Sequence, residues 1–101
     1  MTNISVAELK ERLANKEHIN LLDVREPDER AEFNIGGAFI PVGQVLMMNT
    51  DEIAAWKDEE VICYCRSGKR SMQAGMMLET LGFTNVKNLA GGMLAWEEGG
   101  K

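Results

Sequence analysis

Short apolar runs alternate with longer amphipathic stretches along the whole chain, and this alternation limits the fold more than any other feature of the sequence. The runs at residues 19–24, 38–40, 60–64 and 86–89 predict short strands, and Ile4 predicts an edge strand. Strands that alternate with helices imply a parallel sheet that helices cover on both faces. The sequence therefore predicts an α/β fold.

The stretches between these runs predict the covering helices. Ser5 is expected to cap a helix that ends near residue 15, and Pro27 suits the first turn of a short helix over residues 27–32. Residues 42–56 predict two short helices, the second beginning near Thr50 or Asp51. A longer helix is predicted for residues 70–81, ended by Gly82, and a last one for residues 93–98.

The methionines are expected mainly in the core, because this flexible side chain fills irregular gaps. Met72 and Met76 fall near the same face as Leu78 in the helix predicted for residues 70–81. An exposed patch of Met47 and Met48 near a binding site would instead indicate a surface that contacts a partner.

Size and charge narrow the class of protein. The 101 residues suffice for one domain, 1–101, and are too few for two. The formal net charge of −5 argues against nucleic acid or an anionic membrane as a partner. No apolar stretch has the length of a signal peptide or of a membrane span, so we expect a cytoplasmic protein.

The two cysteines, Cys63 and Cys65, do not suit a disulfide or a metal site. A bond between residues two apart on an extended strand would be strained. The single histidine, His18, lies far away in sequence, and there is no second cluster of Cys or His, so no metal is expected.

Cys65 directly follows a predicted strand and precedes a loop that leads into a helix. Ligands of parallel sheets bind at the carboxyl ends of the strands, and Gly68 permits the positive φ that lets backbone N–H groups converge on one point. The helix dipole and nearby cations lower the pKa of such a thiol, which matters because no histidine is available as a base. We predict an anion cradle around Cys65, whereas Cys63 belongs to the core. The predicted cradle consists of Arg66, Ser67, Gly68, Lys69, Arg70 and Ser71.

Three stretches together resemble the rhodanese family of single-domain sulfurtransferases. Residues 65–71 are similar to the family's active-site loop, with its Cys-x-x-Gly-x-Arg pattern, and residues 22–26 and 89–96 resemble its first and last signature stretches. The resemblance covers essentially the whole chain and implies a five-stranded parallel sheet with helices on both faces. Residues 34–38 depart from the usual His-Ile-Pro-Gly-Ala of the family, which leaves the path of that segment undefined.

The resemblance implies a reaction that needs no cofactor. Cys65 would take a sulfur atom from thiosulfate or a similar small anionic donor and become a persulfide, and cyanide or a cellular thiol would then accept the outer sulfur. Arg66 and Lys69 would bind or steer the donor. Arg70 would either contact the substrate or form a structural ion pair.

Asp23 and Arg25 end the first signature stretch, at the carboxyl end of their predicted strand. In the family, residues at these positions mostly brace the loop and the core. They are therefore expected to support the site from behind rather than to touch the substrate.

Other functions remain open. A sulfur-relay protein that carries persulfide for a partner enzyme would use Cys65 in the same way. Phosphatases and arsenate reductases built on this fold have five residues between the cysteine and the arginine, whereas four separate Cys65 from Arg70 here. Members of the family that only dock partners usually lack the loop cysteine, which is present in this chain.

Overall fold

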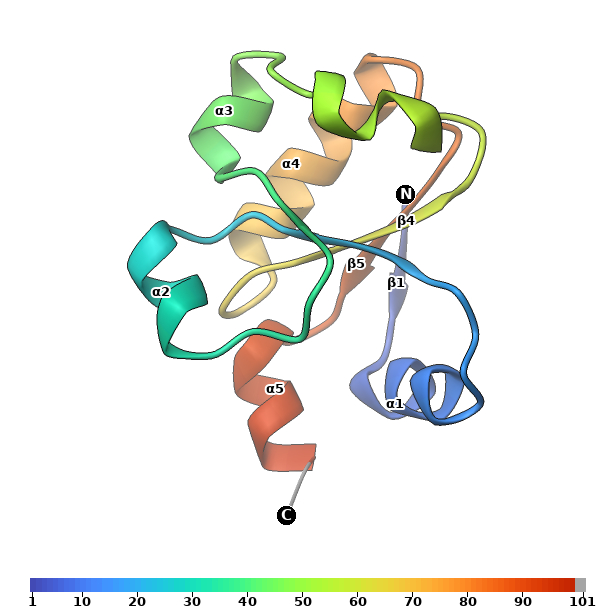
Figure 1. Ribbon diagram of the computed structural model, residues 1–101, viewed down its shortest axis with the longest axis vertical. Coiled ribbons are helices and arrows are strands. Elements are labelled where there is room, and N and C mark those ends of the chain that lie inside the picture. Colours follow the sequence, from blue (N-terminus) through green and yellow to red (C-terminus); the bar gives the residue numbers. More distant parts are fainter. Residues whose placement is uncertain (100–101) are drawn as a thin grey trace.

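Five strands form one sheet, and all neighbouring strands are parallel, in the computed structural model, which describes residues 1–99 (Figure 1). The strand order β1-β5-β4-β2-β3 places β4 at the centre and β1 at an edge. The α/β prediction is confirmed, and the last two residues of the predicted domain, 100 and 101, lie outside the described residues. The strands are β1 (Thr2–Ile4), β2 (Asn20–Asp23), β3 (Ala38–Phe39), β4 (Glu60–Tyr64) and β5 (Asn85–Leu89).

Helices cover both faces of the sheet (Figure 1). One face packs against α1 and α5, and the other packs against α3, the 3₁₀ helix η1 and α4. Residues 42–56 form two short helices, as predicted, and Ser5 caps the first helix by accepting a hydrogen bond of 3.0 Å from the Glu8 N–H. The helices are α1 (Val6–Ala14), α2 (Pro27–Glu32), α3 (Val42–Leu46), η1 (Asp51–Trp56), α4 (Lys69–Thr80) and α5 (Gly92–Gly99).

Alternation along the central strands decides which side chains meet which helices. Ile62 and Tyr64 of β4 pack on the face covered by α1 and α5, whereas Val61, Cys63 and Cys65 pack on the face covered by α4. Both faces of the sheet are therefore apolar, and the side chain of Cys65 is directed toward the helix that follows its own loop.

The prediction that the methionines lie mainly in the core is wrong for most of them. Apart from Leu78, the buried face of α4 consists of small residues such as Ala74 and Gly75. The helix therefore packs closely against the sheet. The long side chains of Met72 and Met76 lie outside this face and are exposed, with 42% and 59% of their surface accessible. Helical periodicity explains the error, because residues at neighbouring positions around a helix can face the core in one case and solvent in the other.

Met47 and Met48, at the end of α3, are exposed as well. Neither of them lines the two hollows beside the Cys65 loop that are described below. Their exposure therefore gives no support to a partner surface at the site.

Candidate active site

The Cys65 loop lies at the carboxyl end of β4, in the middle of the sheet. Cys65 is the first residue after the strand, and Gly68 caps α4 with a left-handed φ of +100°. That conformation is strained for any residue with a Cβ, so glycine is the natural choice there. The predicted turn from strand to helix is confirmed.

The Cys65 sulfur lies inside a cradle of hydrogen-bond donors. Its Sγ accepts hydrogen bonds from the N–H groups of Gly68 at 3.1 Å and Ser71 at 3.4 Å, and the Ser71 hydroxyl lies 3.3 Å away. The residue has no exposed surface. Of the predicted cradle, the structure brings Gly68 and Ser71 to the sulfur most directly, one from the loop and one from the first turn of α4.

The cradle favours the thiolate of Cys65. Burial by itself raises the pKa of a thiol, because it removes water from the charged form. Hydrogen bonds to the thiolate form, from the Ser71 hydroxyl and from the N–H groups of Ser71, Gly68 and Ser67, outweigh burial, so the pKa of Cys65 lies below its ordinary value. No described residue donates to Cys63 in this way, and burial together with the nearby Cys65 raises its pKa to about 12. The two thiols therefore have opposite chemical character.

Sequence reasoning missed Asn88, the last-but-one residue of β5. Its buried side-chain Oδ1 accepts a hydrogen bond from the Ser71 hydroxyl, and its Nδ2 donates to Oδ1 of Asn3 at 3.3 Å. Because β5 neighbours β4 in the sheet, this amide lies directly behind the cradle. The sequence gives no signal for this role, because Asn85 and Lys87 of the same strand are polar as well.

The start of α5 holds the loop from the other side. The N–H of Met93 donates to the carbonyl of Cys65 at 2.9 Å, and the N–H of Leu94 donates to that of Arg66 at 3.0 Å. Gly92 has φ +57°, and a Cβ there would lie 2.5 Å from the Cys65 oxygen. In the sequence, Gly92 is only part of the stretch 89–96 that resembles the last signature of the family, and the structure adds this contact with the loop backbone.

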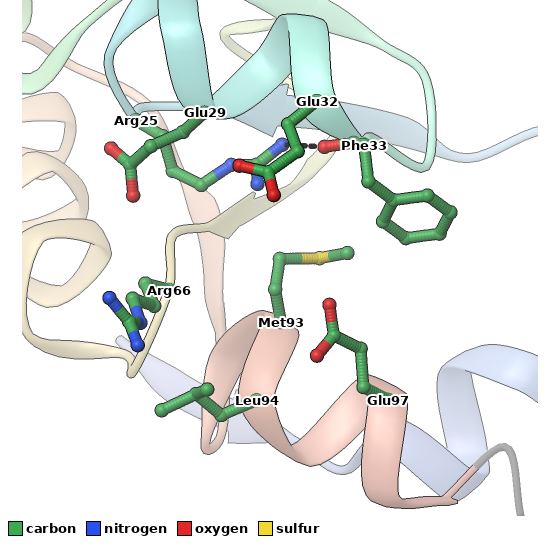
Figure 2. A pocket seen from close by; sticks show the side chains of 8 residues that line it. All are labelled: Arg25, Glu29, Glu32, Phe33, Arg66, Met93, Leu94 and Glu97. Carbon is green, nitrogen blue, oxygen red and sulfur yellow. Dashed lines mark hydrogen bonds between the residues drawn. The ribbon is translucent and has the colours of Figure 1, made fainter.

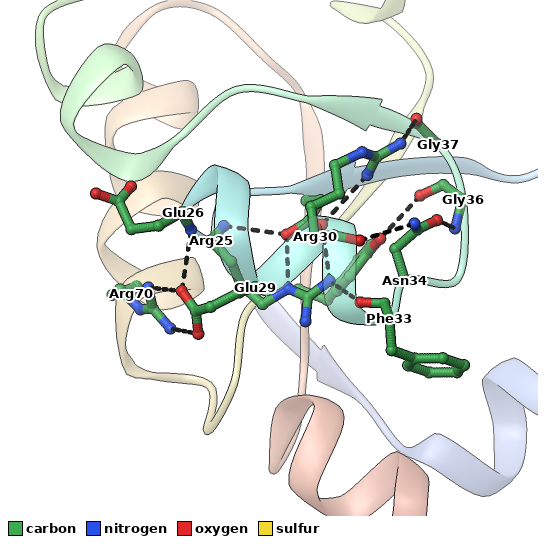
Figure 3. Close-up of polar contacts among 11 residues, drawn as sticks. Arg25, Glu26, Glu29, Arg30, Phe33, Asn34, Gly36, Gly37 and Arg70 are labelled. Carbon is green, nitrogen blue, oxygen red and sulfur yellow. Dashed lines mark hydrogen bonds and ion pairs between the residues drawn. The ribbon is translucent and has the colours of Figure 1, made fainter.

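Arg70 forms an ion pair with α2, the structural alternative that the sequence left open. Its guanidinium donates to both carboxylate oxygens of Glu29, at 2.7 and 2.8 Å (Figure 3). Two parallel bonds of this kind are strong and directional. The hydrogen bonds from Arg70 lower the pKa of Glu29 to about 2. The guanidinium is thus committed to a protein carboxylate rather than directed at the sulfur.

Asp23 and Arg25 form a buried pair at the carboxyl end of β2. Arg25 donates to both oxygens of Asp23 at 3.0 Å and to the carbonyl of Phe33 at 2.6 Å, and Arg30 joins the two segments by donating to Asp23 and to the Gly37 carbonyl (Figure 3). These bonds hold the carbonyls of Phe33 and Gly37, and so constrain the path of residues 34–38, which the sequence left undefined. The pair braces this segment, and Arg25 also lines the pocket beside the Cys65 loop.

A pocket of about 310 Å³ opens beside the loop (Figure 2). Arg66 lies on one side of it, and the carboxylates of Glu32 and Glu97 face the space across Met93. Lys69 lines a different hollow, of about 260 Å³, together with Ser67, Gly68 and Asn88. The structure therefore does not bring the two predicted steering cations together, since they border separate hollows.

These features place the chain in a known family. The model of the rhodanese-like domain matches residues 5–99, and the chain belongs to this family. Among curated relatives, a sulfurtransferase of Allochromatium vinosum is 38% identical, with 99% of this chain and 92% of the relative covered. A human thiosulfate:glutathione sulfurtransferase is 34% identical, with 94% and 92% covered.

Solved structures agree with the family assignment. A rhodanese-like domain protein from Staphylococcus aureus shares 30% identity at a TM-score of 0.80, with 95% of this chain and 91% of that chain covered. A human single-domain sulfurtransferase shares 32% identity at a TM-score of 0.79, with 95% of each chain covered. Among the described residues, no helix has the length and apolar character to cross a membrane.

Proposed function

We propose that this rhodanese-like protein transfers a sulfane sulfur from thiosulfate or a similar small anion to a thiol through a persulfide of Cys65. The observation that carries the proposal is the convergence of hydrogen-bond donors on Cys65 Sγ, which lowers the pKa of this thiol despite its burial. The thiolate is the form of cysteine that attacks sulfur. No neighbouring histidine is needed as a base.

The reaction consists of two displacements. The Cys65 thiolate attacks the outer sulfur of thiosulfate, the sulfur–sulfur bond of the donor breaks, and sulfite leaves with the electron pair. The acceptor thiolate then attacks the outer sulfur of the persulfide, and Cys65 is released as the thiolate again. The N–H groups of Gly68 and Ser71 would stabilise the negative charge in each state.

The pocket beside the loop favours a thiol acceptor over cyanide. It offers the exposed Arg66 to a carboxylate and the exposed Glu32 and Glu97 to an ammonium group, and Phe33 and Met93 add apolar lining. A small peptide thiol carries both charges. The human relative that is 34% identical bears the name thiosulfate:glutathione sulfurtransferase, which agrees with an acceptor of this kind.

Intact mass spectrometry after incubation with thiosulfate tests the proposal. The parent protein should gain the mass of one sulfur atom and lose it again on addition of glutathione. Cys65→Ser should remove both the adduct and sulfur transfer, whereas Cys63→Ser, the matched control two residues earlier in the chain, should keep most of both. Equal losses in two folded variants would contradict the assignment of Cys65.

A sulfur-relay role is the second candidate. A putative sulfur carrier protein of Bacillus subtilis is 34% identical, although this chain covers only 49% of its length. A relay protein would accept sulfur rapidly from a persulfide on another protein and slowly from thiosulfate. Comparison of the two donors at equal concentration distinguishes the roles.

We further propose a cytoplasmic location and one domain over residues 1–101.

A phosphatase or arsenate reductase receives no support from the loop. Such enzymes clamp their tetrahedral anion with the arginine that ends the loop. Here Arg70 holds Glu29 through two hydrogen bonds, and only four residues separate it from Cys65.

A further inference from the structure

The Ser71 hydroxyl has two polar neighbours but only one proton. It donates that proton to Oδ1 of Asn88, and its oxygen lies 3.3 Å from Sγ of Cys65. A carbonyl oxygen only accepts, so as long as Oδ1 faces Ser71 the proton belongs to this bond. Cys65 must then donate to the Ser71 oxygen, which it does only as a thiol.

The thiolate and the persulfide need the opposite arrangement. The thiolate sulfur and the inner Sγ of a persulfide both lack a proton to give, and either one would face the lone pairs of the Ser71 oxygen. The Ser71 proton must therefore turn toward sulfur, which leaves Oδ1 of Asn88 and the Ser71 oxygen facing each other as two acceptors. In a buried site, an acceptor left without a donor is costly.

The amide of Asn88 provides the solution, because it carries a donor at one end and an acceptor at the other. Reversal of the amide lets Nδ2 donate to the Ser71 oxygen and turns Oδ1 toward Asn3. Asn3 is exposed and lines the hollow of about 260 Å³ together with Asn88, so its own amide reorients in contact with solvent. The hydrogen bonds thus link the buried Ser71 hydroxyl, through the Asn88 amide, to the exposed amide of Asn3.

We propose that Asn88 is a positioning residue that acts through Ser71, and that reversal of its amide accompanies conversion of Cys65 from thiol to thiolate or persulfide. In the thiol state, Cys65 donates to Ser71 and Ser71 donates to Asn88. In the thiolate state, the Cys65 proton has left to solvent, Asn88 donates to Ser71 and Ser71 donates to sulfur. The inference deepens the proposed function, because it concerns the thiol that would carry the sulfur.

Other charged and titratable groups lie around the loop, but they do not take the place of Asn88 as the partner of Ser71. None of them hydrogen-bonds to the Ser71 hydroxyl in the described part of the chain. The charged and titratable groups are Arg66, Lys69 and Arg70 near the loop, Asp23 and Arg25 at the end of β2, Glu29 on α2, Glu97 on α5 and Cys63 on β4.

Side-chain NMR of the parent protein tests the proposal without a variant of Asn88. The NH₂ resonances of Asn88 and Asn3 should shift with pH, with the same midpoint as alkylation of Cys65 by iodoacetamide. Ser71→Ala should reduce the Asn88 shift several-fold. An Asn88 resonance that does not move, or that moves equally in Ser71→Ala, would overturn the coupling. Alkylation needs no sulfur donor, so this test is separate from the proposed function.

Asn88→Asp supplies the matching functional test, since a carboxylate accepts but does not donate and so retains the Ser71 proton. In a Cys63→Ser background with a single thiol, alkylation near neutral pH should slow about tenfold or more. The loss should be several-fold smaller when Ser71→Ala is also present, because only the charge of the aspartate then acts. Asn85→Asp, at the exposed start of β5, controls for a negative charge on the strand. Equal losses with and without Ser71 would refute the proposal.

Discussion

Gly92→Ala should damage both the stability and the chemistry of the protein, because Gly92 lies directly against the backbone of the Cys65 loop. A Cβ at this position would lie 2.5 Å from the Cys65 oxygen and 2.6 Å from the carbonyl carbon and oxygen of Arg66, whereas ordinary contact begins at 3.4 Å. The loop backbone would therefore have to move by about 0.9 Å, the difference between 3.4 and 2.5 Å.

Two costs add at this position. A residue with a Cβ in the left-handed region costs roughly 1–2 kcal/mol, and forcing an extra carbon into a packed site costs about 1–3 kcal/mol. The expected total is about 2–5 kcal/mol, a large part of the roughly 5–15 kcal/mol that stabilises a typical domain. A displacement of the loop by about 1 Å is also expected to slow sulfur transfer by up to roughly 100-fold.

Alanine substitutions at two other glycines distinguish the cost of the left-handed backbone from the cost of the steric contact. Gly82 has φ +101°, but a Cβ added there would meet no atom within 4 Å, so Gly82→Ala should lose only about 1–2 kcal/mol and keep its activity. Gly43 lies in α3 with free space and an ordinary φ, so Gly43→Ala should be neutral or more stable by at most about 1 kcal/mol. Urea unfolding followed by tryptophan fluorescence gives the three free energies. If Gly92→Ala is no less stable than Gly82→Ala and transfers sulfur at the parent rate, the close approach of α5 to the loop is wrong.

Three further predictions concern charge and loop size. The pKa of Glu29 is lowered from 4.5 to about 2, so its ion pair with Arg70 should stabilise the fold above pH 4.5 and lose this effect as the pH falls toward 2. Glu29→Gln should make urea stability less dependent on pH across this window, and an unchanged dependence would contradict the pair. Arg66→Ala and Lys69→Ala should each raise the KM for thiosulfate more than the KM for an uncharged donor. Added salt should have the same effect on the parent protein, because it screens the charges. A KM for thiosulfate that does not change with salt would exclude steering by these cations. Hydrolysis of aryl phosphates should be negligible, and one residue inserted after Lys69 should raise phosphate affinity and lower sulfur transfer. Phosphatase activity of the unmodified protein that Cys65→Ser abolishes would favour the rival reaction.

The sequence by itself determined the features that depend on neighbours along the chain. The alternation of apolar runs and amphipathic stretches is local, and it predicted the strands and helices to within one or two residues. The turn around Cys65 is also local, because Gly68 and the start of α4 lie within four residues of the thiol. The resemblance of three stretches to one family added the order of the parts, and the family assignment is confirmed.

Tertiary structure alone decided which distant residues complete the site. Asn88 reaches the cradle because β5 neighbours β4, Glu29 reaches Arg70 from α2, and Gly92 approaches Cys65 because α5 begins beside the loop. The sequence left two roles open for Arg70 and none for Asn88, since a polar side chain takes its role from the partner that the fold brings to it. The same holds for Met72 and Met76, which moved from the predicted core to the surface because close packing of α4 requires small residues on the buried face. Local pattern thus fixes what an element is, whereas the packing of elements fixes what each polar or ambiguous side chain does.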